Sequence, residues 1–222
     1  MSATDLGLRY SCDMNFANQV HYQVAKSRRL AFFILRSFHL QATKLRLFKK
    51  QVRPILEYCT FTATYLSKAE RVAIEYVQRK FTKALLFADR SMGYRVRCRK
   101  LQLDPLWLRR LKLNLIFLHN IIHNRTHLAA GLPTTTIKAR YSLRSADTSL
   151  VYPRSTCSFH QYSFLTYYSS VWNKLPVAIR SATNIYMFRR LLSSHLSLEN
   201  IRTLFSPHLT LDQLFEQGPL RI

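Results

Sequence analysis

The chain has 222 residues, of which 48% are hydrophobic, a proportion that suits a globular protein and excludes a disordered tail. Only four Gly and seven Pro are present, which disfavours a fold built from tight hairpins and favours a mainly α protein. With 34 Lys and Arg against 11 Asp and Glu, the formal net charge is +23, and such self-repulsion favours an anionic partner. We therefore expect nucleic acid as the partner, with an anionic membrane surface as the main alternative.

The first part of the chain changes from an undecided pattern to a helical one. Residues 1–19 alternate short apolar and polar pieces, which fits either strand or loop. A helical stripe follows, made of Val20, Val24, Ser27, Ala31, Ile34 and Phe38. A second helix is expected from Thr43 to Gln51, and Arg53-Pro54 should kink or break it because proline removes an amide donor. Ile55 to Leu66 is then expected as a buried, aromatic-rich segment.

A central helix is expected to begin at Ser67, since Ser67 and Glu70 have the spacing of a capping box. Its residues divide into two faces at helical spacing. The expected buried face consists of Ala69, Val72, Ala73, Tyr76, Val77, Phe81, Ala84 and Leu85, and the expected exposed face of Lys68, Arg71, Glu75, Gln78, Arg79 and Lys83.

The next segment, Tyr94 to Leu103, fits two structures. A strand would place its arginines on one face, whereas a helix would place Tyr94, Cys98 and Leu101 inward. Asp104-Pro105 predicts a helix start, with a carboxylate cap and proline at the first position. The helix from Pro105 to Asn124 should be the most buried one, because apolar residues surround most of its girth. Trp107 there, and Trp172 later, are expected to be substantially buried.

The last third of the chain begins with a segment rich in Thr and Ser from Arg125 to His160, expected to be an extended connector. A helix around Phe164 to Trp172 should follow, and Asn184 should cap another. The predicted fold is mainly α, an irregular helical bundle with a long Thr/Ser-rich connector and little or no sheet. The predicted domains are a helical region over 1–124, a connector over 125–160, and a C-terminal helical segment over 161–222, packed on the first or semi-independent.

Catalytic motifs are missing from the sequence. It has no Ser in a glycine elbow, no glycine-rich phosphate loop and no adjacent acids to hold two divalent ions. His119, His123 and His127 are spaced four apart, but no Cys, Asp or Glu lies between Asp104 and Asp147 to complete a metal site. We expect no enzyme activity from the chain alone, no metal and no cofactor.

The location of the protein is predicted from its termini, its apolar stretches and its cysteines. The N-terminus lacks the pattern of a secretion signal, and the longest apolar stretch is too short to span a bilayer. The four Cys are far apart, which fits a reducing compartment. We expect an intracellular protein, nuclear or cytoplasmic and not secreted.

Clusters of bases supply the candidate binding residues. For any single cluster a solvated face is the alternative interpretation, but their number favours a surface for phosphates. The candidates are Lys26, Arg28, Arg29, Arg71, Arg79, Arg95, Arg97, Arg99, Arg109 and Arg110. They are expected to bind the backbone of RNA, DNA or an RNA–DNA hybrid.

Several blocks resemble one known family. Val52-Arg53-Pro54, Leu56-Glu57-Tyr58, Ile74-Glu75 and Val77-Gln78-Arg79 resemble the sequence after the palm in reverse transcriptases of non-LTR retrotransposons, which are RNA-directed DNA polymerases. Leu101-Gln102-Leu103, the segment from Leu106 to Arg110, and Trp172-Asn173-Lys174-Leu175-Pro176 are similar to later blocks of that family. The resemblance covers about residues 6 to 196. One departure is that Ser163 to Val171 lacks the arginine that commonly precedes the tryptophan motif.

The resemblance implies a thumb-like helical region that grips template and primer. The family's catalytic aspartates belong to a palm that would precede residue 1, so it implies a binding module without activity of its own, with a palm from another chain as a partner. Two alternatives are a decayed relic of a retroelement and a cationic helical protein on a membrane surface. The membrane alternative is disfavoured because the helix from Pro105 is apolar nearly all round and requires a protein core.

Overall fold

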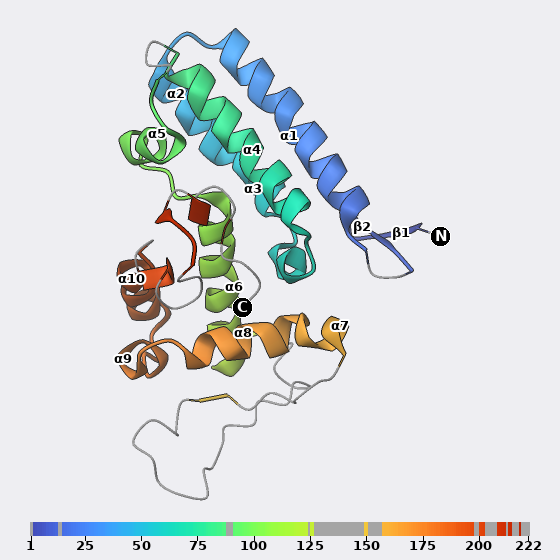
Figure 1. The fold of residues 1–222 in the computed structure, drawn as a ribbon, viewed down its shortest axis with the longest axis vertical. Coiled ribbons are helices and arrows are strands. Elements are labelled where there is room, and N and C mark those ends of the chain that lie inside the picture. The colour runs from blue at the N-terminus through green and yellow to red at the C-terminus, as the bar shows by residue number, and fades with distance from the viewer. Residues whose placement is uncertain are drawn as a thin grey trace, which may run out of the picture. The chain divides into compact units, whose positions relative to one another are not determined.

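The computed structural model describes residues 2–12, 15–87, 91–123, 125–126, 149–150, 157–197, 200–202, 208–211, 213–214 and 218. In these residues the chain is mainly helical with one small two-stranded hairpin, which confirms the predicted fold class (Figure 1). Most of the connector predicted over 125–160 lies outside the described residues.

The elements follow one another along the chain as two strands and then a series of helices. They are β1 (Ser2–Asp5), β2 (Leu8–Ser11), α1 (Ala17–Ser37), α2 (Gln41–Leu47), the π-helix η1 (Phe48–Val52), α3 (Arg53–Glu57), the 3-10 helix η2 (Thr60–Thr64), α4 (Lys68–Leu85), α5 (Tyr94–Lys100), α6 (Leu106–Ile122), α7 (Ser158–Gln161), α8 (Phe164–Asn173), α9 (Val177–Arg180) and α10 (Ile185–His195).

The chain forms two compact units, which divide inside α6. Unit 1 comprises residues 1–110 with 205–222, and unit 2 comprises residues 111–204. The predicted domain boundaries after residues 124 and 160 stay a prediction.

The N-terminal segment is a strand hairpin, one of its two predicted alternatives. β1 pairs with β2 antiparallel, and Asp5 lies opposite Leu8. Leu6 and Gly7 between them have φ angles of 45° and 81°, the positive values that a tight two-residue hairpin turn requires. The Tyr58 hydroxyl donates a hydrogen bond to the Leu6 carbonyl, which holds this turn against the rest of unit 1.

Unit 1 is built on α1 and α4, which lie side by side (Figure 1). The predicted α1 stripe is confirmed from Val20 to Ile34, where each of its members is buried. The Gln23 amide donates to the Tyr58 carbonyl at 3.0 Å, and the Gln41 amide donates to the Leu85 carbonyl at 3.3 Å. The α2–η1–α3 segment therefore runs back along α1 and α4, and it contributes the fully buried Phe48, Val52 and Leu56 to the core.

The interruption predicted at Arg53-Pro54 takes the form of the π turn η1, which ends directly before Arg53. The ring of a helical proline crowds the carbonyl four residues earlier, here that of Lys50, and a wider turn relieves this crowding. The burial predicted for Ile55 to Leu66 is wrong in its aromatic part. Tyr58 is 45% exposed and Phe61 is 44% exposed.

The α4 helix begins as predicted, but its buried face differs. The Ser67 hydroxyl accepts from the Glu70 amide at 3.3 Å, and the Ser67 amide donates to the Glu70 carboxylate at 2.6 Å, which confirms the capping box. The buried residues of α4 are Ile74, Glu75, Val77, Gln78, Phe81 and Thr82, whereas Ala69, Val72, Tyr76 and Ala84 are exposed. The polar Glu75 and Gln78 were predicted to be exposed and instead lie in the interior.

Tyr94 to Lys100 forms α5, and Tyr94, Cys98 and Leu101 lie inward, as the helical alternative predicted. The following α6 buries Leu106, Leu108, Leu111, Leu115, Leu118 and Ile121. Trp107 is only partly buried, less than predicted. A Cβ placed on Gly218, whose φ is +74°, would lie 3.1 Å from Cγ of Trp107, so these two residues are closely packed.

The core of unit 2 centres on Trp172 of α8 and Phe188 of α10. Both are buried, and their rings stack with centroids 5.5 Å apart. The Asn173 side chain pairs with both backbone groups of Leu150 at 2.9 Å, and the Asn184 side chain accepts from the Tyr186 amide at 2.8 Å. The predicted helix that ends near Asn173 and the predicted cap at Asn184 are confirmed.

Candidate nucleic-acid interface

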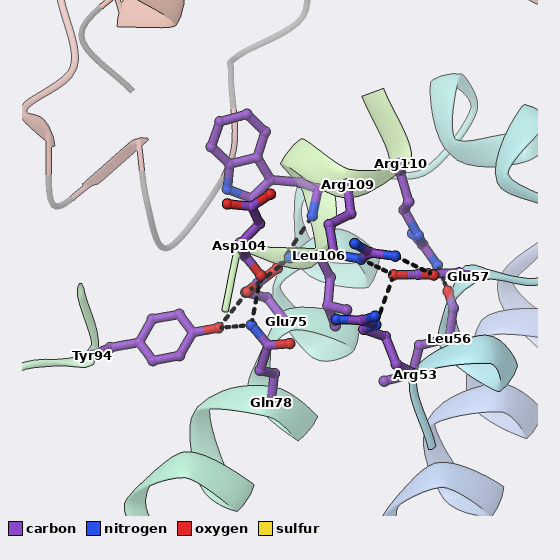
Figure 2. Close-up of polar contacts among 11 residues, drawn as sticks. Arg53, Leu56, Glu57, Glu75, Gln78, Tyr94, Asp104, Leu106, Arg109 and Arg110 are labelled. Carbon is purple, nitrogen blue, oxygen red and sulfur yellow. Dashed lines mark hydrogen bonds and ion pairs between the residues drawn. The ribbon is translucent and has the colours of Figure 1, made fainter. Parts of the chain in front are cut away.

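A buried carboxylate joins α4, α5 and α6, the three helices that carry all the predicted arginines except Arg28 and Arg29. Glu75 of α4 accepts hydrogen bonds from the backbone amides of Leu106 at 2.9 Å and Trp107 at 3.4 Å, and from the Tyr94 hydroxyl (Figure 2). The cap of α6 by Asp104 stays a prediction, and the sequence did not indicate that the Glu75 carboxylate accepts from the first amides of α6. Side chains of α4 and α5 thereby join the start of α6.

Burial and the hydrogen bonds of this network both affect the pKa of Glu75. Burial raises the pKa of Glu75 to about 7, although the hydrogen bonds from Tyr94 and from the Trp107 and Leu106 amides act in the opposite direction. Gln78 completes the cluster, since its amide donates to the Tyr94 hydroxyl at 3.1 Å and to the Asp104 carbonyl at 3.0 Å. Glu75 is tolerated in the interior because both of its carboxylate oxygens have partners there, and the Gln78 amide nitrogen likewise has partners, whereas Oε1 of Gln78 is buried without a hydrogen bond in the described residues.

Three of the predicted binding arginines are engaged in the framework of unit 1. Arg97 is 5% exposed and donates to the Met92 carbonyl. Arg110 is 6% exposed and donates to the Leu56 carbonyl. Arg109 forms an ion pair with Glu57, with a second contact at 3.2 Å (Figure 2). We therefore leave Arg97, Arg109 and Arg110 out of the candidate interface.

The other predicted residues are more accessible. Lys26, Arg28, Arg29, Arg79 and Arg99 are exposed, and Arg71 and Arg95 are partly buried. The structure brings Lys26, Arg28 and Arg29 of α1 next to the helix that carries Arg79, whereas Arg95 and Arg99 lie on α5. We define the basic face as the exposed Lys and Arg residues of α1 and α4, which are Lys26, Arg28, Arg29, Arg36, Lys68, Arg79, Lys80 and Lys83.

A groove of about 390 Å³ runs between α1 and α4. This α1–α4 groove is lined by Arg28, Ala31, Phe32, Leu35, Tyr76, Val77, Lys80, Phe81 and Ala84. The charged groups of Arg28 and Lys80 each lie 5.2 Å from the centre of the Tyr76 ring, and that of Arg36 lies 5.4 Å from the centre of the Phe32 ring. These distances are those of cation–π pairs.

The electrostatic environment of the groove is positive. A hydrogen bond from Lys80 lowers the pKa of Tyr76, and the charges of Lys80, Arg28 and Arg79 lower it further, against a smaller opposing effect of burial. The sequence of α1 contains no Asp or Glu, and the acids of α4 are Glu70 in the first turn and the buried Glu75. Both helices therefore offer an anion a surface with little opposing charge.

The predicted site residues did not include the groove residues Phe32, Tyr76 and Lys80, nor Arg36, whose charged group lies over the Phe32 ring. Phe32 is an aromatic residue off the predicted buried stripe of α1 and is 60% exposed, so its position was a usable signal. Tyr76 was assigned to the buried face of α4 and is 37% exposed. Its pairing with Arg28 links residues 48 positions apart, which helical spacing alone does not indicate.

His119 of α6 lies in the interior of the fold, and His123 directly follows the helix. His119 is fully buried, its Nε2 lies 2.7 Å from the Ala182 carbonyl, and its ring stacks on Phe188 at 4.3 Å. The His123 ring lies 4.3 Å from the His119 ring, and His127 lies outside the described residues. Within the described part of the chain, no group of three His, Cys, Asp or Glu could hold a metal ion.

Among the helices that the structure describes, none has both the length and the apolar character needed to cross a bilayer. Comparison of the chain with protein-family models, with curated proteins and with solved structures gave no match.

Proposed function

We propose that the chain binds nucleic acid through the basic face of α1 and α4. The observation that carries the proposal is the collection of exposed bases on two adjacent helices, interleaved with the aromatic side chains of the α1–α4 groove. Lys and Arg side chains on such a surface displace the counterions of a phosphate backbone, which gives affinity without reading sequence.

The arginines that stabilise unit 1 differ from those of the basic face, and this difference supports the proposal. Arg97 and Arg110 donate hydrogen bonds to backbone carbonyls of unit 1, and Arg109 forms an ion pair with Glu57. Glu57 and Glu75 are also acids that the fold uses internally, with Glu75 on the α6 amides. Internal use of these acids leaves the outer sides of α1 and α4 predominantly cationic.

The resemblance to non-LTR reverse transcriptases agrees with this proposal but rests on the sequence blocks alone. We propose that the chain is a thumb-like module that grips template and primer, with a polymerase palm from another chain as its partner. It would then incorporate no nucleotides by itself. A decayed relic would instead lack measurable binding to any nucleic acid.

The test is the salt dependence of binding, measured by fluorescence anisotropy with labelled duplex DNA, single-stranded RNA and a hybrid duplex. For about five phosphate contacts, the slope of log affinity against log salt on duplex DNA should be about −4.5. Replacing Lys26, Arg29 and Lys83 together by Gln should flatten that slope by about 2 to 3 and weaken binding similarly for different sequences.

The matched control replaces three exposed bases of unit 2, Arg189, Arg190 and Arg202, by Gln. Its net charge equals that of the basic-face variant, so an effect of overall charge would appear equally in both. Equal flattening in the control would contradict the assignment to α1 and α4. Saturable binding to anionic vesicles, with negligible binding to all three nucleic acids, would overturn the proposal in favour of a membrane surface.

A further inference from the structure

We propose that the α1–α4 groove holds an unpaired base, so that the chain prefers single-stranded nucleic acid, or the single-stranded part of a junction, over a continuous duplex. This inference rests on the proposed function and names the form of nucleic acid that its site selects.

The shape and lining of the groove suit a flat, largely apolar group. Its volume of about 390 Å³ lies in the range of small-molecule sites. Phe32 from α1 and Tyr76 from α4 both line it and remain 60% and 37% exposed. Aromatic side chains in a cationic groove are the platforms on which bases of single strands stack, whatever their sequence.

The cations around the groove suit the phosphates on either side of a stacked base. Arg28 and Lys80 both lie 5.2 Å from the Tyr76 ring centre, and Arg36 lies near the Phe32 ring. From Arg28 to Leu35, α1 rises by about 10 Å, so the groove has room for few nucleotides. Charge complementarity thus favours a polyanion with aromatic bases over an uncharged apolar segment.

A continuous duplex cannot use the groove in this way. Its bases are stacked on one another and present only their edges, and moving one out costs the energy of unpairing and unstacking. A duplex would still contact the basic face through its phosphates. The structure therefore predicts two separable contributions, one from charge that both forms share and one from stacking that favours the single strand.

Phe32 and Phe33 provide a matched pair of variants. Both are on α1 and nearly equally exposed, at 60% and 59%, but only Phe32 lines the groove. Phe32→Ala should weaken binding of a single-stranded 12-mer about tenfold, a factor within the range for one base–aromatic stack. Phe33→Ala should change it less than twofold, and both variants should change duplex affinity less than twofold. Circular dichroism and urea unfolding verify that both variants fold.

A second measurement reports the stack directly. A 2-aminopurine base in the single strand should lose fluorescence on binding to the unmodified chain and to Tyr76→Phe, which keeps the ring. It should lose clearly less on binding to the Phe32→Ala and Tyr76→Ala chains. Equal quenching in all four would overturn the inference.

The remaining outcomes separate this inference from the proposed function. Equal affinity for single strand and duplex with a steep salt slope would overturn the groove assignment and leave nucleic-acid binding intact. Absence of binding to both forms would overturn both proposals. Binding of an amphipathic Leu/Glu helical peptide in the groove, without a preference for single strands, would overturn the inference in favour of a protein partner.

Discussion

Glu75 of α4 accepts hydrogen bonds from the backbone amide of Leu106 with both carboxylate oxygens, at 3.2 and 2.9 Å, across 31 positions of sequence. The first amides of a helix have no partner within it, and their dipoles favour a negative charge. Here a neighbouring helix supplies the acceptor oxygens from the interior. Removing the Glu75 side chain would take an acceptor from the Leu106 and Trp107 amides and from the Tyr94 hydroxyl.

Replacing Glu75 by Ala should therefore cost about 2 to 4 kcal/mol of unfolding free energy in urea, because several buried donors lose their acceptor. Glu75→Gln should cost less, since it keeps one acceptor oxygen. The control is Glu70→Ala in the exposed capping box of the same helix, expected to cost about 1 kcal/mol. A cost for Glu75→Ala no larger than that of Glu70→Ala would contradict the capping role.

The raised pKa of Glu75 predicts a dependence of stability on pH. Its folded-state value of about 7 exceeds the ordinary 4.5, so between these values the folded chain binds more protons than the unfolded one. The contribution is fully present below about pH 4.5 and is lost as pH rises through about 7, by about 3 kcal/mol at most. The difference in unfolding free energy between the unmodified chain and Glu75→Gln should fall accordingly from pH 4.5 to 8. Parallel curves for the two chains would show that Glu75 is not the group responsible.

The α4 helix shows how far the sequence alone could go. Ser67 and Glu70 predicted its start, because a capping box depends on residues three apart. The buried face was misplaced because hydrophobicity ranks Glu75 and Gln78 as outward residues. Their burial depends on Tyr94, Leu106 and Asp104, which become neighbours only in the folded chain.

The candidate site shows the same limit. The excess of bases predicted an anion-binding surface, and Lys26, Arg28, Arg29 and Arg79 are indeed exposed. The sequence could not predict which arginines are buried. Arg97 is one base in a run of several, and nothing in the sequence distinguishes it as the one that donates to the Met92 carbonyl. The α1–α4 groove likewise needs the packing of two helices that are distant in sequence.

His119 should titrate below its ordinary range. Burial lowers its pKa from the ordinary 6.5, and this outweighs the hydrogen bond to Ala182. A carbonyl only accepts, so Nε2 carries the proton, and the buried Nδ1 has no partner in the described residues to receive a second one. Because the unfolded chain binds the proton more readily, this residue should destabilise the fold as pH falls below 6.5. Proton NMR titration measures the pKa of His119 directly, and the His119→Gln variant assigns its resonance. A pKa at or above 6.5 would contradict the burial of this ring.

The two tryptophans should differ in their contribution to stability. Trp172 is 1% exposed and stacks on Phe188, so Trp172→Ala should cost about 3 to 5 kcal/mol. Trp107 is partly buried and packs on Gly218, so Trp107→Ala should cost clearly less. Urea unfolding followed by far-ultraviolet circular dichroism compares them. A larger cost at Trp107 would show that the core of unit 2 is misassigned.

The buried and exposed arginines should separate stability from binding. Arg97→Gln should lower the unfolding free energy by about 2 to 4 kcal/mol, because the Met92 carbonyl loses a charged donor and a buried site loses volume. Below its unfolding midpoint the variant should keep the salt slope of nucleic-acid binding. Arg29→Gln is the counterpart, since Arg29 is exposed on α1. It should change stability by less than about 0.5 kcal/mol and flatten the salt slope by about 0.9. If Arg97→Gln flattened the slope without a loss of stability, Arg97 would contact phosphate, and the division between framework and interface would be wrong.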